Sequence, residues 1–254
     1  MTSFSLTGKR ALVTGASRGL GLHFARVLAE AGADVALLAR DRMALEVAAK
    51  DIAKTGHRAV AVECDVTKGD SVRLAIAVTF EALGGIDILI NNAGIAISKP
   101  LLEHSEADWD KVLDTNLKGA WLMAQTCAAR WIAAKQPGRI VNIASLLALR
   151  TARNVVSYAA AKAGLVHLTH TLALELGRHG IAVNALAPGY VETDINRDFL
   201  ASEAAKPMLG RIPLGRTGLP KDLDGALLLL ASDAGAYITG AVIPVDGGHG
   251  VGGI

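Results

Sequence analysis

A tyrosine and a lysine four residues apart, Tyr158 and Lys162, are the side chains in this sequence best suited to chemistry. In a helix, positions i and i+4 project from the same face, so this spacing sets a phenol beside an ammonium group. A free phenol titrates near ~10, and a neighbouring cation lowers that pKa by favouring the phenolate. The pair is therefore predicted to exchange a proton with an alcohol near neutral pH.

Two further polar residues, Ser145 and Asn116, stand at informative positions. Ser145 follows a segment rich in β-branched residues, 139–144, so its hydroxyl is predicted to lie at the carboxyl edge of a sheet and to hydrogen-bond a substrate carbonyl. Asn116 lies inside an expected helix over 105–134, where a short amide side chain competes with backbone hydrogen bonds and can kink the helix. Taken alone, Asn116 could equally be an exposed polar residue.

A glycine-rich turn over 14–21, with the sequence TGASRGLG, joins the first expected strand to a helix. Backbone N–H groups and the positive end of that helix can hold a pyrophosphate, and glycines allow its close approach. The spacing G-x-x-x-G-x-G differs from the G-x-G-x-x-G fingerprint, so a tight turn without a ligand is the competing interpretation. The turn residues predicted to bind a dinucleotide are Gly15, Ser17, Arg18, Gly19, Leu20 and Gly21.

The end of the second expected strand decides which nicotinamide cofactor binds. An NAD site places an acid there for the ribose hydroxyl, whereas this chain has Ala39 followed by Arg40. Together with Arg18, Arg40 can hold a 2′-phosphate between two planar guanidinium groups. The sequence therefore favours NADP(H). NAD(H) is the second possibility, in which Arg40 and Arg42 only begin a solvated helix and Asp41 binds the ribose.

Short apolar segments rich in β-branched residues recur along the chain, separated by amphipathic helical segments. Their hydrophobicity is continuous rather than alternating, which is typical of parallel strands covered on both faces. The alternation predicts an α/β, doubly wound, Rossmann-like fold, with a seven-stranded parallel sheet and three helices on each face. The expected strands are 10–14, 34–38, 59–63, 86–91, 139–144, 181–187 and 241–245.

The alternation has no linker, so residues 1–254 are predicted to form a single dinucleotide-binding and catalytic domain. Two regions break the rhythm. Segment 190–220 contains several prolines and glycines and is too long for an ordinary connection, which indicates a substrate lid. The tail 246–254 contains five glycines, which disfavour a helix, so it is either held by its neighbours or mobile.

Composition argues against several classes of function. A formal net charge of +2 without basic runs speaks against nucleic acid or an anionic membrane, and no segment approaches the ~20 apolar residues of a membrane span. Cys64 and Cys127 lack metal-ligand or redox spacing and are expected to be buried thiols of a cytoplasmic protein. His167 and His170 share a helix face but lack a third ligand, so no metal site is predicted.

In this order, the motifs resemble those of the short-chain dehydrogenase/reductase superfamily, and the match covers essentially the whole chain. The resemblance implies an NADP-dependent oxidoreductase of ketones or secondary alcohols, in which Tyr158 is the general acid/base and Lys162 lowers its pKa and holds the nicotinamide ribose. It also implies an Asn116-bound water and a homotetramer or homodimer paired through long helices. The implied catalytic residues are Asn116, Ser145, Tyr158 and Lys162, and further cofactor contacts are Asp65, Val66, Asn92, Ala93, Gly94, Pro188, Gly189, Val191 and Thr193.

Other functions stay open on the sequence. GASRG over 15–19 matches the G-x-S-x-G elbow of serine hydrolases, and Asp246 and His249 follow Ser17 in the required order, although only one strand precedes the elbow. The same fold could also serve a non-redox epimerase or lyase, or a nucleotide-sensing protein. Within the resembled superfamily, 3-oxoacyl-carrier-protein reductases and gluconate 5-dehydrogenase-like polyol enzymes are both candidates.

The substrate pocket is expected beside the catalytic residues and is mostly apolar, which favours a ketone or secondary alcohol with a hydrophobic body. Arg150 and Arg153 could nevertheless reach a carboxylate, and Arg130 could contact a carrier protein. The expected lining residues are Ile95, Ala96, Ile97, Leu146, Leu147, Val155, Tyr190 and Val191.

Overall fold

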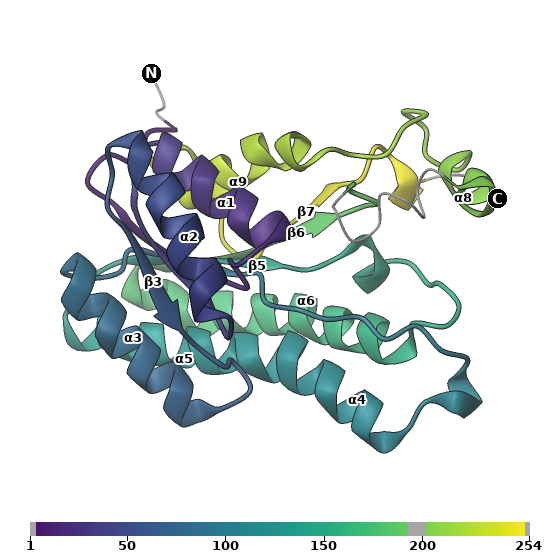
Figure 1. Cartoon of the computed structure of the whole chain (residues 1–254), viewed down its shortest axis with the longest axis horizontal. Coiled ribbons are helices and arrows are strands. Elements are labelled where there is room, and N and C mark those ends of the chain that lie inside the picture. The colour runs from purple at the N-terminus through teal and green to yellow at the C-terminus, as the bar shows by residue number, and fades with distance from the viewer. Residues whose placement is uncertain (1–3, 193–201, 252–254) are drawn as a thin grey trace.

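The computed structural model describes residues 4–192 and 202–251, and a parallel β-sheet forms its centre (Figure 1). The strands are β1 (Arg10–Thr14), β2 (Asp34–Ala39), β3 (Ala59–Glu63), β4 (Ile88–Asn91), β5 (Gly138–Ile143), β6 (Ile181–Pro188) and β7 (Val242–Val245). They pair in the order β3-β2-β1-β4-β5-β6-β7, and all neighbours run parallel. The predicted sheet is confirmed, with strand ends shifted by at most two residues.

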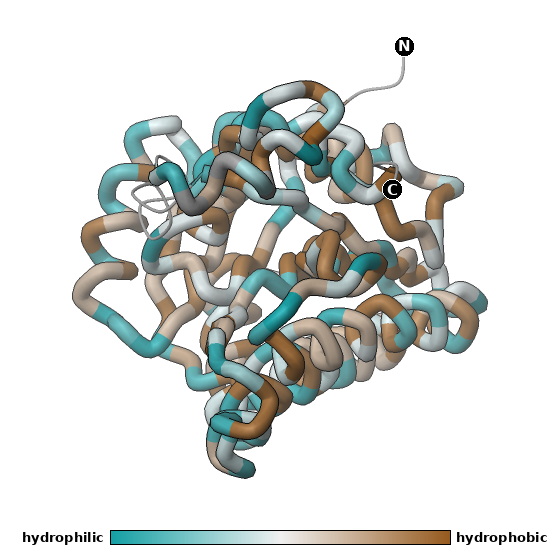
Figure 2. The backbone as a smooth tube through the Cα atoms, turned by 90° about the vertical axis from the view of Figure 1, so that its right-hand side faces the viewer, coloured by the Kyte–Doolittle hydropathy of each residue, from teal (hydrophilic) through white to brown (hydrophobic). Residues whose placement is uncertain are grey.

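Three helices pack on each face of the sheet, as predicted (Figure 1). One face is covered by α1 (Gly19–Glu30), α2 (Arg42–Ile52) and α9 (Asp224–Ala231), and the other by α3 (Gly69–Leu83), α5 (Gly119–Ala133) and α6 (Val156–Leu176). Hydrophobic and hydrophilic residues are interspersed along the helical turns of the backbone (Figure 2). The sequence thus places a hydrophobic layer on both sides of every central strand.

The central strands are buried on both faces, which explains their continuous hydrophobicity. On β1, Val13 belongs to the cluster that contains Phe24 and Leu227, whereas the adjacent Leu12 belongs to the opposite cluster with Trp131. All five side chains are fully buried. Burial of each such side chain contributes roughly 1.5–3 kcal/mol to the stability of the fold. The two clusters therefore stabilise the sheet whose carboxyl edge carries the predicted site.

The segment predicted as one helix over 105–134 is instead divided into α4 (Glu106–Leu113), a π-helix η3 (Asp114–Lys118) and α5. Within η3, the side chain of Asn116 forms two 2.8 Å hydrogen bonds with Ile95: its Nδ2 donates to the Ile95 carbonyl and its Oδ1 accepts from the Ile95 N–H. The wider turn directs this amide towards a neighbouring segment. Single π-turns of this kind occur frequently at functional sites.

The irregular segment after β6 is described only in part. Of the predicted lid over 190–220, the structure describes 190–192 and 202–220, which contain η6 (Glu203–Ala205) and α8 (Lys206–Leu209). A parallel bridge between Val191 and Gly218 ties the two ends together. Within the described ranges, the structure contains no helix that is long and apolar enough to cross a membrane.

The glycine-rich tail after β7 is folded, as far as Val251, around the carboxylate of Asp246. One carboxylate oxygen accepts the N–H of Gly248 at 2.9 Å and the other accepts that of Gly250 at 2.7 Å. The short helical turn η9 (His249–Val251) follows. Of the two expectations for this segment, the structure favours a tail held by its neighbours.

Candidate active site

The tyrosine–lysine pair lies on the first two turns of α6. Tyr158 and Lys162 share a helix face, as predicted, and the lysine Nζ is 5.7 Å from the centre of the phenol ring. Lys162 is only 4% exposed and donates a 2.7 Å hydrogen bond to the carbonyl of Ile143, the last residue of β5. This bond holds the ammonium group at the end of the strand that leads to Ser145.

The pKa values of the pair correct one expectation from the sequence. Burial raises the pKa of Tyr158 above its ordinary value; a hydrogen bond with Ser145 lowers it, and the charge of Tyr190 raises it further. The predicted lowering by Lys162 is not found in the protein chain itself, because burial dominates. Burial also lowers the pKa of Lys162 to about 8. Near neutral pH the phenol is therefore protonated and the lysine is charged.

Ser145 stands two residues beyond the end of β5, at the predicted edge of the sheet. It caps the short turn η4 (Leu146–Ala148), where its Oγ accepts the N–H of Leu147 at 3.1 Å. The same hydroxyl lies close enough to the Tyr158 phenol to lower its pKa. The hydrogen bond from Leu147 therefore holds the hydroxyl at the sheet edge, near the phenol.

Asn116 and Lys162 approach each other across Gly94. A Cβ placed on Gly94 would lie 3.4 Å from the Asn116 Oδ1 and 3.6 Å from the Lys162 Nζ. Asn116 is 1% exposed, and both of its amide atoms bond the backbone of Ile95. Its observed contact is thus to the segment after β4. The structure brings all four predicted catalytic residues, Asn116, Ser145, Tyr158 and Lys162, to one region of the sheet edge.

The glycine turn after β1 has conformations that other residues rarely adopt. Gly15 has φ of +67° and Gly19 has φ of +58°. A Cβ on Gly15 would lie 2.9 Å from the Ala93 Cα, and a Cβ on Gly21 would collide with the Gly15 carbonyl. Around Gly19, by contrast, there is open space at the start of α1. The turn therefore has the tight backbone and accessible helix N-terminus of a phosphate cradle.

The segment after β4 holds this turn in place. The Asn92 side chain donates to the Thr14 carbonyl at 3.0 Å, and the N–H groups of Asn92 and Ala93 both donate to the Thr14 Oγ1 at 3.0 Å. Asn92 was predicted as a cofactor contact. Its hydrogen bonds show that it also positions the turn, which links the ends of β1 and β4.

Arg18 and Arg40 are both exposed at this edge, after β1 and β2. The neighbouring groups have other partners: Asp41 caps α2 by accepting the N–H of Ala44 at 3.0 Å, and Arg42 pairs with Glu46. The alternative in which Asp41 binds a ribose is therefore disfavoured, because its carboxylate already serves the helix. Arg40 directly follows the carboxyl end of β2 and is exposed there.

Asp65 follows β3 and lies close enough to Arg40 for the two charges to interact. Burial raises the pKa of Asp65, but hydrogen bonds from Thr67 and the charges of Lys68 and Arg40 outweigh it, so this pKa lies below its usual value. The next residue, Val66, is buried against the start of α5. The predicted adenine-side pair is thus an ionised carboxylate beside an apolar side chain.

The turn after β6 contains the remaining residues predicted to contact the cofactor. The N–H of Gly189 donates to the Val245 carbonyl at 3.0 Å, and a Cβ at this position would lie 2.7 Å from the Asp246 Cα, so only glycine fits. Pro188 ends β6 and Val191 is 6% exposed. Thr193, the last predicted cofactor contact, lies outside the described residues.

Comparisons with known proteins agree with this arrangement. Residues 15–250 match the family described as Enoyl-(Acyl carrier protein) reductase, one of the short-chain dehydrogenase families. The chain is 39% identical over 249 residues to 2-dehydro-3-deoxy-D-gluconate 5-dehydrogenase of Escherichia coli (strain K12), covering 98% of both chains. The chain belongs to the short-chain dehydrogenase/reductase superfamily. It is therefore an oxidoreductase of this superfamily, as the motifs predicted.

Two further similar proteins carry names for different substrates. The chain is 39% identical over 244 residues to a 3-oxoacyl-(acyl-carrier-protein) reductase of Chlamydia muridarum, covering 96% of this chain and 98% of the other. A gluconate 5-dehydrogenase from Burkholderia cenocepacia J2315, solved in complex with NADP and tartrate, superposes with a TM-score of 0.95 at 37% identity, covering 99% of both chains. Both names match alternatives that the sequence left open.

The serine hydrolase alternative does not fit this superfamily member. Ser17 follows β1, whereas Asp246 and His249 follow β7, and β4, β5 and β6 lie between those strands. At about 4.8 Å per strand, the two ends are roughly 19 Å apart in the sheet. The Asp246 carboxylate accepts two backbone N–H groups instead of a histidine. These residues do not form a catalytic triad.

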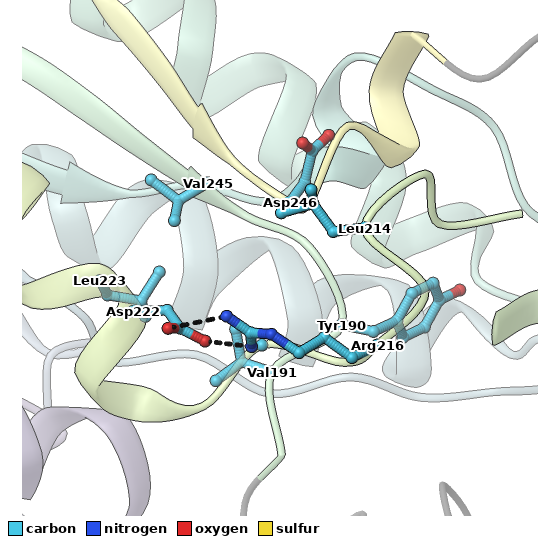
Figure 3. A pocket seen from close by; sticks show the side chains of 10 residues that line it. Tyr190, Val191, Leu214, Arg216, Asp222, Leu223, Val245 and Asp246 are labelled. Carbon is cyan, nitrogen blue, oxygen red and sulfur yellow. Dashed lines mark hydrogen bonds and ion pairs between the residues drawn. The ribbon is translucent and has the colours of Figure 1, made fainter.

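A cavity of about 240 Å³ adjoins the site between the ends of β6 and β7 and the segment 214–223 (Figure 3). Arg216 and Asp222 lie along one side, where the guanidinium donates two hydrogen bonds of 2.6 and 3.1 Å to the carboxylate. Tyr190 lines the cavity, but Ser145, Tyr158 and Lys162 do not. The cavity thus borders the reaction site without containing it.

Tyr190 has a closer connection with the chemistry than its predicted place in the pocket lining suggested. Its charge raises the pKa of Tyr158, so the two phenols are close enough to influence each other electrostatically. The signal in the sequence was weak, since Tyr190 only follows the Pro-Gly turn.

His167 and His170 lie with ring centres 6.4 Å apart, and the described residues contain no group of three or more potential metal ligands.

Proposed function

We propose that this enzyme transfers hydride between NADP(H) and a ketone or secondary alcohol, with Tyr158 as general acid and base. The observation that carries the proposal is the joint placement of the Tyr158 phenol, the Ser145 hydroxyl near it and the buried Lys162 ammonium beside the ring. In reduction, hydride adds to the carbonyl carbon while Tyr158 gives its proton to the carbonyl oxygen. Ser145 would bind that oxygen, and oxidation reverses both transfers.

The protonation states suit this role. Because burial keeps the pKa of Tyr158 above its ordinary value, the phenol holds a proton to donate. Lys162 is charged below its pKa of about 8. A positive charge beside the phenol favours the phenolate that forms as the proton leaves. Lys162 would thus stabilise the product of proton transfer and not the resting tyrosine.

The remaining residues of the edge would hold NADP(H), which supplies the hydride when bound. The close approach at Gly15 and Gly21 and the open helix start at Gly19 fit a pyrophosphate. Arg18 and Arg40 would bind the 2′-phosphate of the adenine ribose. The other proposed contacts are Ser17, Leu20, Asp65, Val66, Asn92, Ala93, Gly94, Pro188, Gly189, Val191 and Thr193, and Tyr158 and Lys162 would contact the nicotinamide ribose.

For the substrate we propose a polyhydroxy acid or its keto form. The support comes from relatives named for gluconate and 2-dehydro-3-deoxy-D-gluconate. The second candidate is a 3-oxoacyl group on a carrier protein, supported by the relative of that name. Against it, Arg130, the cation suggested for carrier binding, lies 5.0 Å over the Phe80 ring, where it is engaged by that ring.

We also propose a cytoplasmic, single-domain enzyme that assembles as a homotetramer or homodimer, with 190–220 acting as a lid. The support for assembly is apolar surface on the long helices: Trp121 on α5 is 40% exposed and Leu174 on α6 is 85% exposed. The support for a reducing compartment is that Cys64 and Cys127 are buried free thiols. Light scattering of the purified chain measures the assembly.

A panel of carbonyl substrates, read at the absorbance band of reduced nicotinamide with NADPH and NADH in parallel, tests the function. We expect NADPH-dependent reduction of 5-keto-D-gluconate to exceed that of an acetoacetyl thioester. Turnover of the thioester alone would select the second candidate. If NADPH binds but no carbonyl on the panel changes its absorbance, a non-redox epimerase, lyase or nucleotide sensor on the same fold becomes the better account.

A further inference from the structure

Three neighbouring strands end side by side at the substrate end of the edge. Ser145 follows β5, Tyr190 follows β6 and the tail begins with Asp246 directly after β7. The pairings Ile143 with Leu186 and Pro188 with Val245 align the three ends. Because parallel strands finish at the same edge, the segments that follow them meet there. The tail is therefore a neighbour of the catalytic residues.

The tail packs closely against two segments of the chain, residues 212–213 and Leu146, and this close packing is called the clamp. Cβ atoms placed on its glycines would lie 2.9 Å from Ile212 at Gly247, 3.0 Å from Pro213 at Gly248 and 3.1 Å from Leu146 at Gly250. Leu146 is the residue next to Ser145. The backbone of the tail thus lies between residues 212–213 and the turn after Ser145, with little room for side chains at the three glycines.

A long-range hydrogen bond adds to the clamp. The Nε of Arg150 donates to the carbonyl of Gly250 at 2.5 Å, which joins the loop after Ser145 to the end of the chain. The one side chain between the clamped glycines is that of His249. Its ring lies 5.5 Å from the ring of Tyr190, at an angle of 34°. The clamp therefore sets an imidazole against the phenol that neighbours Tyr158.

The Nδ1 of His249 is buried and has no hydrogen-bond partner among the described residues. A buried polar nitrogen without a partner is unfavourable and uncommon in folded proteins. Two charged residues that contact the tail have other partners: Asp246 accepts two tail N–H groups and Arg150 donates to the Gly250 carbonyl. The hydrogen-bonding capacity of this nitrogen is therefore not used within the described residues.

We infer that His249 is a specificity-determining residue, whose Nδ1 hydrogen-bonds an oxygen of a polyhydroxylated substrate at a position remote from the reacting carbonyl. The inference rests on the proposed function and deepens it. It assigns the tail a role in reading a polar substrate body, in a pocket whose other predicted walls, such as Ile95 and Leu146, are apolar. The oxygen belongs to a carboxylate or to a hydroxyl, which have this hydrogen-bonding chemistry in common.

Two substitutions separate hydrogen bonding by His249 from packing. His249→Phe keeps an aromatic ring against Tyr190 and removes the nitrogen. His249→Asn removes the ring and retains a short amide with a donor and an acceptor near the place of Nδ1. The matched control is His179→Phe, the same change at the opposite end of β6, where His179 bonds only Arg178 among the contacts described.

The three variants are compared on three ketones with NADPH: 5-keto-D-gluconate, fructose and cyclohexanone. We expect His249→Phe to lower kcat/KM for 5-keto-D-gluconate relative to cyclohexanone by about tenfold to a hundredfold, mainly through KM, as loss of a hydrogen bond to a polar or charged group predicts. His249→Asn should recover much of that ratio, and His179→Phe should match the parent. A parallel loss for fructose identifies a hydroxyl as the partner; a loss confined to 5-keto-D-gluconate identifies the carboxylate.

The inference is overturned if His249→Phe leaves the ratio at the parental value, or if His249→Asn is as impaired as His249→Phe. Reduction of cyclohexanone but of neither polyhydroxy compound by the parent enzyme would also overturn it, while leaving the proposed hydride transfer intact. Inactivity of the parent on all three ketones, with NADPH still bound, would instead contradict the proposed function, and the inference would fall with it.

Discussion

The two halves of the sheet edge are built differently. At the ends of β1 to β4, the glycine turn is shaped by backbone geometry and held by short contacts such as those between Asn92 and Thr14. At the ends of β5 to β7, the site is assembled from side chains far apart in the sequence, as the hydrogen bond between Arg150 and Gly250 shows. The first half therefore depends on backbone conformation at a glycine motif, and the second on the packing of side chains.

This difference assigns separate tasks to the two halves. A nucleotide is the same molecule in every member that uses it, and a backbone cradle suits it. A substrate differs between enzymes, so its site is better built from replaceable side chains and loops. Substitutions in the first half should change cofactor binding, whereas those in the second half should change turnover or substrate choice.

The largest effect after that of the tyrosine itself is expected from Ser145→Ala. Loss of the hydroxyl that would bind the carbonyl oxygen should lower kcat by about 10²–10³, the usual effect of removing one such donor. The dissociation constant for NADPH, measured by fluorescence titration, should stay at the parental value. Ser157→Ala is the control, because the Ser157 hydroxyl is buried beside Tyr158 without a hydrogen-bond partner among the described residues. Equal losses in both variants would contradict a specific role for Ser145.

In the cofactor half, Gly15→Ala should weaken NADPH binding by about tenfold or more. The free turn would relax out of the left-handed conformation, and binding would have to restore it at roughly 1–2 kcal/mol, where 1.4 kcal/mol is a factor of ten. The new Cβ would also lie 2.9 Å from the Ala93 Cα. Calorimetric titration with NADPH measures the effect. Gly225→Ala, in α9 where nothing lies within 4 Å of the new Cβ, should bind NADPH normally. Normal binding by Gly15→Ala would remove the turn from the cofactor site.

Arg40→Asp, also in the cofactor half, tests how the enzyme discriminates between NADPH and NADH. Loss of a charged contact with the 2′-phosphate should raise the KM for NADPH by about tenfold while the KM for NADH changes little or falls. Initial rates with each cofactor provide the measurement, and Arg42→Asp, at a residue paired with Glu46, is the control. Equal changes for NADPH and NADH would show that Arg40 does not contact the phosphate.

The smallest effect concerns pH. The pKa of Lys162 is lowered to about 8, so the ammonium group is charged below that pH and becomes neutral above it. If the charge supports proton transfer, kcat/KM for reduction should fall as pH rises through about 8, approaching tenfold per pH unit. Lys162→Arg keeps a permanent charge and should lose this decline, whatever its absolute activity. Persistence of the same inflection in Lys162→Arg would assign it to another group.

Local patterns were sufficient to predict the strands and the glycine turn. Continuous runs of apolar residues mark strands buried on both faces, and Gly15 and Gly19 mark backbone conformations that few other residues adopt. The break in the helix over 105–134 was not predicted in full. The sequence pointed to Asn116 as a source of distortion, but the π-turn depends on its bonds to Ile95, which lies 21 residues earlier.

Two features of the substrate half required the tertiary structure. The sequence predicted that Lys162 lowers the pKa of Tyr158, since the spacing shows this neighbour. It does not show the burial that raises the pKa instead. The position of His249 could not be predicted from a glycine-rich tail, since it depends on contacts with Leu146 and Pro213 from distant segments. Nonlocal burial and packing account for both differences.

The central claim is that the Tyr158 phenol passes the proton that accompanies hydride transfer. The most direct measurement is the single-turnover rate of NADPH oxidation by Tyr158→Phe with a ketone that the parent enzyme reduces, alongside Tyr237→Phe, which alters a fully exposed tyrosine. We predict a rate about 10²–10⁴ lower for Tyr158→Phe, with NADPH affinity retained, and a parental rate for Tyr237→Phe. A parental rate for Tyr158→Phe would contradict the account.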